Sequence, residues 1–169
     1  MPAGGSCLLG SINLSEFVED PFTEKASIKW ASLVNCVNVA VEALNDVLLE
    51  GLNLHPLEVQ RQTVGQLRQI GLGTMGLGDM LIKLGVTYGS TVSLVIIDEV
   101  FKTIASTAVL KSLDMAKEFG MFEACDPHKL IQSNFLSTLN LDTEVIEQIK
   151  MHGLYNSQLL TCAPTGSIA

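Results

Sequence analysis

The sequence predicts a helix-rich α/β protein with long amphipathic helices between two or three short strands. Apolar residues recur at three- and four-residue steps over long stretches, which is the spacing of one face of an α helix. Two short apolar runs, one near each end of the chain, favour strands instead. With 169 residues and no internal repeat, the chain fits one domain or a piece of a larger one.

The first fifty residues predict a strand followed by a long helix. An apolar run over residues 7–14 follows a Pro/Gly-rich opening and leads to a turn near Asp20-Pro21. From residue 23 to residue 50 the apolar side chains keep helical spacing. Gly51 supplies the stop, because glycine is common just past the end of a helix.

The middle of the chain predicts three more helices. The stretch "LEVQRQTVGQLRQ" is amphipathic, and Pro56 precedes it at a plausible first helical position. The stretch "DMLIKLG" reads as a short helix that Gly85 ends. Ser90 is placed to cap a long helix that runs through residue 119 and stops at Gly120.

The last third of the chain predicts little regular structure. Residues 121–142 are mixed in character and loop-like, with a turn of helix after Pro127. Residues 143–151 form a short helix. Residues 157–164, "SQLLTCAP", are a second apolar strand, which "TGSIA" follows.

Composition argues against a nucleic-acid or membrane partner. The net charge is −8 and the ten basic residues form no run, whereas phosphate backbones are bound by clustered Lys and Arg. The mean hydropathy of +0.36 is high for a soluble domain. The apolar stretch "WASLVNCVNVAV" is nevertheless shorter than the roughly 20 residues of a membrane span, and no leader pattern opens the chain. We therefore expect a cytoplasmic protein whose helices are covered on several sides, including by polypeptide outside this chain.

The cysteines do not form a recognisable metal or disulfide pattern. Cys7, Cys36, Cys125 and Cys162 show no CxxC pair and no histidine at zinc-ligand spacing. The three histidines are isolated from one another. We expect no metal site, and the simplest interpretation of each cysteine taken alone is a small buried apolar residue.

One glycine pattern raises a specific alternative. "RQIGLGTMGLGDML" holds Gly71, Gly73 and Gly76 in the spacing G-x-G-x-x-G, which can wrap a dinucleotide pyrophosphate. That fold needs a strand before the first glycine, a helix after the third, and an acidic residue at the end of a second strand. "VSLVIID", ending at Asp98, lies at a suitable distance to be that second strand.

The context of the glycines weakens the dinucleotide interpretation. The residues before Gly71 are polar and helix-periodic, where a buried parallel strand would be a continuous apolar run. The apolar residues around Asp98 continue at helical spacing as far as Met115. We favour glycines that allow close packing, and keep an NAD(P)-dependent dehydrogenase as the alternative. A helical interaction module without chemistry is the third hypothesis.

Three stretches together resemble one family. "GGSCLLGSINLSEFV", "RQIGLGTMGLGDMLIKLGVTYGS" and "NSQLLTCAPTGSIA" look like the catalytic (large) subunit of ribonucleotide reductase, in the right order and over essentially the whole chain. The forms "CLLGSINL" and "LLTCAPTGSI" most resemble the class II, adenosylcobalamin-dependent enzymes. Class I and class II, and diphosphate and triphosphate substrates, remain open alternatives.

The resemblance implies a fold and a reaction. The family fold is a ten-stranded α/β barrel with the active site inside, so residues 1–169 would be a single incomplete domain, a part of that barrel. The family reduces ribonucleotides to 2′-deoxyribonucleotides for DNA replication by thiyl-radical chemistry. By resemblance Cys7 is one of the redox-active cysteine pair that forms a disulfide in each turnover, with its partner outside this chain.

A second site follows from the same resemblance. In the family, the last motif is a loop that holds the substrate phosphates. Here that loop comprises Pro164, Thr165, Gly166, Ser167 and Ile168. Consecutive backbone N–H groups and two hydroxyls there could bind an anion, more strongly if a helix begins there. Asn156 receives a supporting, hydrogen-bonding role, and Cys162 is interpreted as packing.

The resemblance also implies what the chain lacks. The family's Asn-x-Cys-x-Glu radical motif does not occur in the sequence. We expect a fragment that is inactive alone and that needs the remainder of the reductase chain. Adenosylcobalamin and a thioredoxin-type reductant are implied for the full enzyme. Helix faces made to cover absent strands would be left bare and would favour association, including association of copies of the chain.

Overall fold

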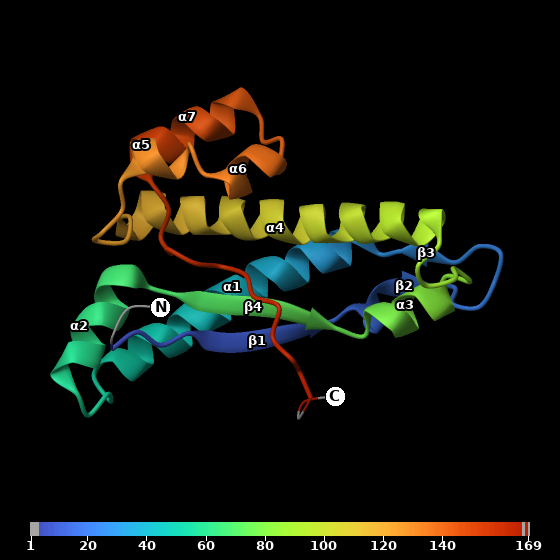
Figure 1. The fold of residues 1–169 in the computed structure, drawn as a ribbon, viewed down its shortest axis with the longest axis horizontal. Coiled ribbons are helices and arrows are strands. Elements are labelled where there is room, and N and C mark those ends of the chain that lie inside the picture. Colours follow the sequence, from blue (N-terminus) through green and yellow to red (C-terminus); the bar gives the residue numbers. More distant parts are fainter. Residues whose placement is uncertain (1–3, 167, 169) are drawn as a thin grey trace.

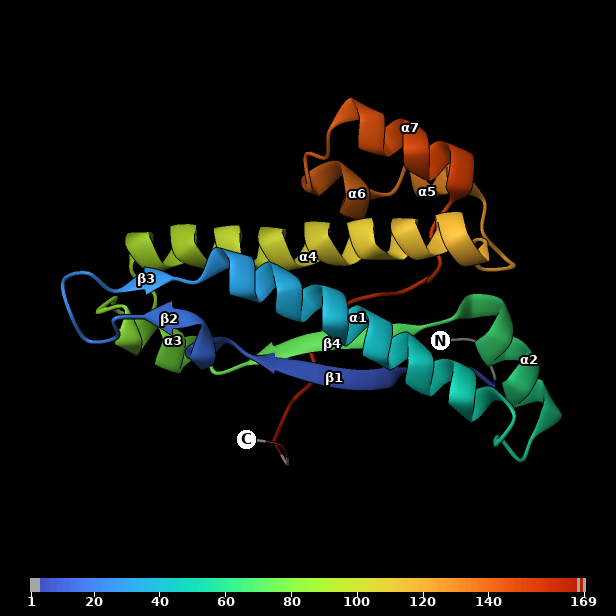
Figure 2. The same ribbon diagram turned by 180° about the vertical axis from the view of Figure 1, so that it is seen from behind.

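A computed structural model describes residues 4–166 and 168, and it has a helix-rich α/β fold (Figure 1). Two parallel strands lie at its centre, β1 (Leu8–Asn13) and β4 (Ile70–Met75). The long helix α1 (Trp30–Leu52) covers one face of this sheet, as the view from behind shows (Figure 2). The C-terminal segment crosses the opposite face (Figure 1). We call the face under α1 the closed face and the face that the C-terminal segment crosses the open face.

The register of the sheet is continuous from Leu8 opposite Ile70 to Asn13 opposite Met75. The predicted strand at residues 7–14 is therefore confirmed as β1. Strand β4 is absent from the sequence prediction, because glycines interrupt its apolar run and glycine is depleted in strands. The strands that the structure describes form two two-stranded sheets and no closed barrel, so the partial ten-stranded barrel stays a prediction.

The predicted C-terminal strand is only partly correct. Residues 158–161 lie beside β4 on the side away from β1, through a single parallel bridge between Leu72 and Leu160. The Ile70 N–H donates to the Gln158 carbonyl at 3.0 Å, and the Thr161 N–H donates to the Leu72 carbonyl at 3.1 Å. The segment is thus a short third row of the sheet, and the chain leaves the sheet after it.

Helix α1 forms the centre of the core. Its buried residues Leu33, Val37, Val41 and Leu48 follow helical spacing and face the sheet and α4. Among the described helices, α1 alone is long and apolar enough to cross a membrane. Its contacts with the sheet and α4 account for the apolar residues on its buried face, whereas Val39, Val47 and Leu49 are exposed.

The predicted bounds of this helix are wrong at both ends. The helix begins at Trp30 rather than at residue 23, because β3 (Ser27–Ile28) pairs antiparallel with β2 (Val18–Glu19) just before it. Gly51 lies inside the helix, whose C-cap is Asn53. Helical periodicity alone could not detect a two-residue strand pair.

Helix α4 (Thr91–Phe119) is continuous over 29 residues, as predicted. The Ser90 hydroxyl caps it by accepting a bond from the Ser93 N–H at 3.2 Å. Gly120 ends it with a φ of +81°, a conformation that glycine adopts without strain. The shorter elements around the sheet are η1 (Leu14–Phe17), α2 (Glu58–Leu67) and α3 (Leu77–Lys83).

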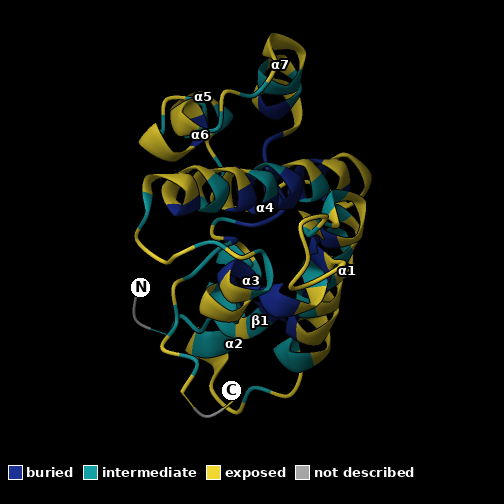
Figure 3. Ribbon diagram, turned by 90° about the vertical axis from the view of Figure 1, so that its right-hand side faces the viewer, coloured by how far each residue is buried: buried dark blue, intermediate teal, exposed yellow. Residues whose placement is uncertain are grey.

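Three short helices lie on the side of α4 away from the sheet, α5 (Pro127–Leu130), α6 (Asn134–Thr138) and α7 (Thr143–His152) (Figures 1 and 2). The predicted helical turn after Pro127 and the predicted helix at 143–151 are both present, whereas α6 is missing from the prediction. Its five residues are too few to show a period. Buried residues concentrate on α1, α4 and the sheet, and exposed ones dominate α5 to α7 (Figure 3).

The glycine pattern does not form a dinucleotide site. Gly71 and Gly73 lie inside β4, the second strand of the β1–α1–α2–β4 unit, whereas a pyrophosphate turn follows the first strand. Gly76 occupies the N-cap of α3 with a φ of +71°. Asp98 lies within α4, where it is exposed and paired with Lys102 at 2.7 Å, so it cannot end a strand. The dehydrogenase alternative is therefore wrong.

Candidate functional site

The two faces of the sheet are chemically different. A Cβ on Gly10 would stand 3.4 Å from Leu44 of α1, which identifies the closed face. Side chains alternate along a strand, so Cys7, Leu9 and Ser11 lie on the other, open face. Leu9 is 61% exposed there. The open face therefore presents a thiol, a hydroxyl and an uncovered apolar side chain.

The Cys7 thiol lies against β4 at the position of a glycine. A Cβ on Gly71 would stand 2.9 Å from the Cys7 Sγ and 2.7 Å from a methyl carbon of Leu9. The absence of a side chain at Gly71 leaves the room that the sulfur occupies. Burial raises the pKa of the half-buried Cys7 thiol above its ordinary value. The thiol is consequently protonated at neutral pH.

Helix α2 supports the segment that leads to Cys7. Gly4 has a φ of +79°, and a Cβ there would stand 3.0 Å from the Val59 carbonyl oxygen and 3.2 Å from the Thr63 hydroxyl. The backbone before β1 can lie this close to α2 because position 4 has no side chain. The approach of the chain to Cys7 is thus set by α2.

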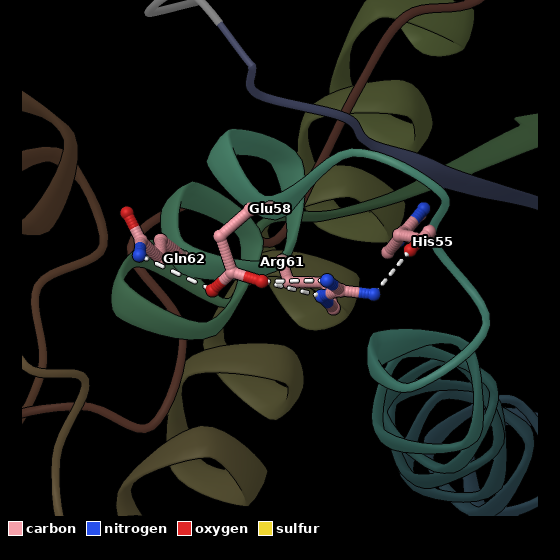
Figure 4. Close-up of polar contacts among 4 residues, drawn as sticks. All are labelled: His55, Glu58, Arg61 and Gln62. Carbon is pink, nitrogen blue, oxygen red and sulfur yellow. Dashed lines mark hydrogen bonds and ion pairs between the residues drawn. The ribbon is translucent and has the colours of Figure 1, made fainter.

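The start of α2 is in turn braced by polar contacts with the loop before it (Figure 4). The Arg61 guanidinium donates to Glu58 at 2.6 and 3.0 Å and to the His55 carbonyl at 2.9 Å. The Gln62 amide donates to the other Glu58 oxygen at 3.2 Å. The hydrogen bond from Arg61 and its charge lower the pKa of the Glu58 carboxyl. We call these four residues the α2 cluster.

The C-terminal segment comes near the Cys7 thiol on the open face. A Cβ on Gly71 would stand 2.9 Å from the Cys7 Sγ, as stated above, and 3.1 Å from the Thr161 methyl carbon. The Thr161 carbonyl oxygen lies 3.1 Å from the corresponding point on Gly73. After Thr161 the chain continues across the open face (Figure 1). The fold therefore brings the thiol and the strand that precedes the predicted phosphate loop together.

The predicted loop is a turn without a helix in its described residues. Thr165 has a φ of +54°, and its hydroxyl donates to the Pro164 carbonyl at 2.8 Å. The Ile168 N–H donates to the Thr165 carbonyl at 3.2 Å. A Cβ on Gly166 would meet nothing within 4 Å. Ser167 lies outside the described residues. No helix begins within residues 164–166, so the additional attraction that a helix start would give is not present there.

The structure does not enclose the two predicted sites in one cavity. Neither Cys7 nor the loop lines any of five cavities or surface grooves among residues 4–166 and 168. Cys36 lines an apolar groove of about 470 Å³ between α1 and β1. Cys162 is exposed, so its interpretation as a packing residue is wrong within this chain. Within the described ranges, no group of three His, Cys, Asp or Glu could hold a metal ion.

Sequence reasoning missed two polar residues behind the site. Asn45 of α1 and Ser112 of α4 are both fully buried, and both hydrogen-bond to Asn156 at the start of the C-terminal segment. The supporting, hydrogen-bonding role predicted for Asn156 agrees with these contacts. The available signal was a polar residue at position 45, on the apolar face that Val41 and Leu48 define.

Comparison with known proteins identifies similar sequences over almost the whole chain. The family model described as "Ribonucleotide reductase, barrel domain" matches residues 2–169. A vitamin B12-dependent ribonucleoside-diphosphate reductase of Thermoplasma acidophilum is 35% identical over 97% of the chain and 18% of its own length. The ribonucleoside-diphosphate reductase subunit alpha of Chlamydia pneumoniae is 30% identical over 96% of the chain and 17% of its own length.

A viral relative extends the range of these similarities. The ribonucleoside-diphosphate reductase large subunit of Acanthamoeba polyphaga mimivirus is 28% identical over 95% of the chain and 19% of its own length. The chain thus spans less than a fifth of the length of these three curated relatives. The residues matched include Cys7, the glycines of β4 and the predicted phosphate loop.

Proposed function

This chain belongs to the ribonucleotide reductase barrel-domain family, and from that premise we propose that it is part of the catalytic subunit of a ribonucleoside-diphosphate reductase. Such an enzyme converts ribonucleotides to 2′-deoxyribonucleotides, the precursors for DNA replication. The supporting observation is that Cys7 and Thr161, three residues before the loop, both lie against Gly71 on the open face. The chemistry needs such an arrangement, with a reducing thiol near the sugar and donors near its phosphates.

Cys7 supplies one of two thiols that reduce the substrate. In each turnover two cysteine thiols become one disulfide, and their two electrons and two protons replace the 2′-hydroxyl by hydrogen and release water. The second thiol belongs to polypeptide outside residues 1–169. A thioredoxin-type dithiol then reduces the disulfide and is itself oxidised. The raised pKa of Cys7 keeps its proton available for this transfer.

Residues 164–168 bind the phosphates of the ribonucleotide. The exposed Gly166 lets an anion approach the backbone closely, because no side chain or neighbour occupies the space where its Cβ would stand. Backbone N–H groups in a turn with left-handed residues can converge on an anion. The left-handed Thr165 provides such a turn. The Thr165 hydroxyl, now bonded to the Pro164 carbonyl, is a further donor if it rotates.

Adenosylcobalamin belongs to the complete enzyme in this proposal and not to this chain. The relative from Thermoplasma acidophilum is named as vitamin B12-dependent. None of the five cavities above is lined by Cys7, and this chain's own residues are given no part in holding the cofactor.

The remaining parts of the proposal concern the rest of the protein. The open face, with Leu9 61% exposed, is covered by the remainder of the reductase chain, which completes a ten-stranded α/β barrel. Residues 1–169 alone are inactive and associate through such bare faces. The complete enzyme acts in the cytoplasm.

A chimeric enzyme tests the function. Residues 2–169 replace the aligned segment of the Thermoplasma acidophilum reductase, and ribonucleotide reduction is measured with adenosylcobalamin and a dithiol. We expect multiple turnovers from the chimera. Cys7→Ser should abolish them, because one of the two reducing thiols is gone.

Cys36→Ser is the matched control, because Cys36 is also half-buried but lines the groove between α1 and β1. It should leave turnover within about twofold. Sustained turnover by the Cys7→Ser chimera would contradict the redox role. Unchanged KM in a chimera carrying Gly166→Asp, which places a negative charge in the loop, would contradict phosphate binding there.

A further inference from the structure

A buried network of neutral side chains lies where the C-terminal segment begins. Asn45, Ser112 and Asn156 are each at most 2% exposed. They come from α1, from α4 and from the segment after α7, so they are distant in sequence. We call these three residues the buried network. It joins three parts of the chain at one point in the core.

Asn156 uses its full side-chain hydrogen-bonding capacity in this network. Its amide donates to the Asn45 Oδ1 at 2.6 Å and to the Arg68 carbonyl at 2.8 Å. Its Oδ1 accepts from the Ser112 hydroxyl at 3.1 Å and from the Asn45 amide at 3.3 Å. An asparagine side chain has two donors and two acceptor sites, and all are occupied. A displaced Asn156 would leave buried donors or acceptors without these partners.

The backbone next to Asn156 is held as well. The Asn156 N–H donates to the Ser112 hydroxyl at 3.1 Å, and the Tyr155 N–H donates to the Ser112 carbonyl at 3.1 Å. The Arg68 guanidinium lies 4.2 Å from the centre of the Tyr155 ring and donates to the Gly120 carbonyl at 3.0 Å. The segment therefore enters the sheet from a fixed point.

That fixed point is coupled to the register of the third row on β4. Arg68, whose carbonyl Asn156 binds, lies two residues before β4. The next bonds along the segment run from the Ser157 N–H to the Leu67 carbonyl and from the Ile70 N–H to the Gln158 carbonyl, both at 3.0 Å. A slip of one residue would move Thr161 off the open face, because successive side chains point to opposite faces.

We propose that Asn45, Ser112 and Asn156 are positioning residues that set the register of residues 157–161 on β4 and so fix where Thr161, and the loop that follows it, lie relative to Cys7. The inference deepens the proposed function and rests on it for the role of the loop. Buried polar groups are known to specify one arrangement where apolar packing would allow several. Here the alternatives are neighbouring registers of an extended segment held by few backbone bonds.

Hydrogen exchange in the chain itself tests the positioning without any activity. Ser112→Ala removes one oxygen, and with it the bonds to the Asn156 N–H and Oδ1. The amide hydrogens of Leu72 and Thr161 form hydrogen bonds between β4 and the third row. We expect both to exchange about tenfold faster in the variant. Those of β1, which pair with β4, should keep their rates.

Ser106→Ala is the matched control, because Ser106 lies on the same helix and outside the buried network. It should change neither set of amides. A uniform increase over β1 and the third row in Ser112→Ala would mean a general loss of stability and would overturn the proposal. So would unchanged rates at Leu72 and Thr161. If Ser112→Ala does not fold, Asn45→Ala gives the same comparison, with Asn38→Ala as its control.

The chimeric reductase then separates positioning from function. Ser112→Ala should raise KM for the ribonucleotide several-fold and leave kcat at saturating substrate within about twofold, since the loop is displaced and Cys7 is intact. Faster exchange at Leu72 and Thr161 with an unchanged KM would overturn the link between the register of the segment and the position of the loop. An inactive parent chimera would instead refute the proposed function, while the exchange rates would still decide the register.

Discussion

The closed and open faces of the β1–β4 sheet differ in what they contribute. On the closed face Ile12, Ile70 and Leu72 are at most 5% exposed beneath α1. On the open face Leu9 is 61% exposed, and glycines stand where side chains would otherwise meet Cys7 and Thr161. The closed face supplies burial and hence stability. The open face gives up burial and leaves room for a thiol and a crossing segment.

The difference shows how one two-stranded sheet can carry both a core and a proposed site. Side chains of adjacent residues point to opposite faces, so the closed-face and open-face positions alternate along each strand. Substitutions at neighbouring positions should therefore have very different effects. The predictions below run from the largest expected change in stability to the smallest.

Ile70→Ala breaks the closed face. Ile70 is fully buried, so removing its side chain should lower the free energy of unfolding by about 3 kcal/mol through lost burial and a cavity. Urea unfolding measures the loss. Ile82→Ala is the control, because Ile82 is 63% exposed on α3 and should cost less than about 0.5 kcal/mol. Equal losses in the two variants would contradict the assignment of the faces.

Gly71→Ala fills the space that the open face keeps free. The new Cβ would stand 2.9 Å from the Cys7 Sγ and 3.1 Å from the Thr161 methyl carbon, so both must move. We expect a loss of about 1 kcal/mol in urea unfolding, because the contacts are side-chain ends that can shift. In the chimeric reductase the same change should reduce turnover even where the chimera remains folded.

Gly78→Ala is the matched control for that variant. Gly78 lies in α3, and a Cβ there would meet nothing within 4 Å. Its stability should be unchanged or raised by up to about 1 kcal/mol, because alanine favours helix. A loss in Gly78→Ala as large as in Gly71→Ala would remove the steric explanation.

The pH dependence of alkylation should sharpen the description of Cys7. Burial raises the pKa of this thiol, so its reactive thiolate should form at a higher pH than in an unfolded control peptide. The raised pKa also means that protonation of Cys7 favours the folded state. This contribution to stability is present below the ordinary pKa of cysteine and is lost as pH rises through the folded pKa. Mass spectrometry after iodoacetamide pulses reads the Cys7 peptide, and a midpoint at or below that of the peptide would contradict the burial.

Leu9→Gln should have the smallest effect on stability. Leu9 is already 61% exposed, so the free energy of unfolding should change by less than about 0.5 kcal/mol. The variant should reduce association of the isolated chain, which light scattering measures, because it removes an apolar side chain from the open face. A large loss of stability would mean that the open face is part of the core.

Local structure was largely predictable from the sequence. The strand at β1, the capped helix α4 and the helices α2, α3 and α7 follow from apolar spacing and from Ser90, Gly85 and Gly120. These signals act within a few residues, so they need no knowledge of the rest of the fold. The resemblance that identified the family also rested on short stretches of sequence.

Only the tertiary structure decided what those elements do together. Pairing with β1 makes a strand of the glycine-rich residues 70–75, which no local preference favours. Positions far apart in the chain come together at two places. Cys7 and Thr161 both approach Gly71, and Asn45 and Ser112 both bond to Asn156 in the core. Such contacts depend on how packed layers align, and the spacing of residues along one segment carries no record of that alignment.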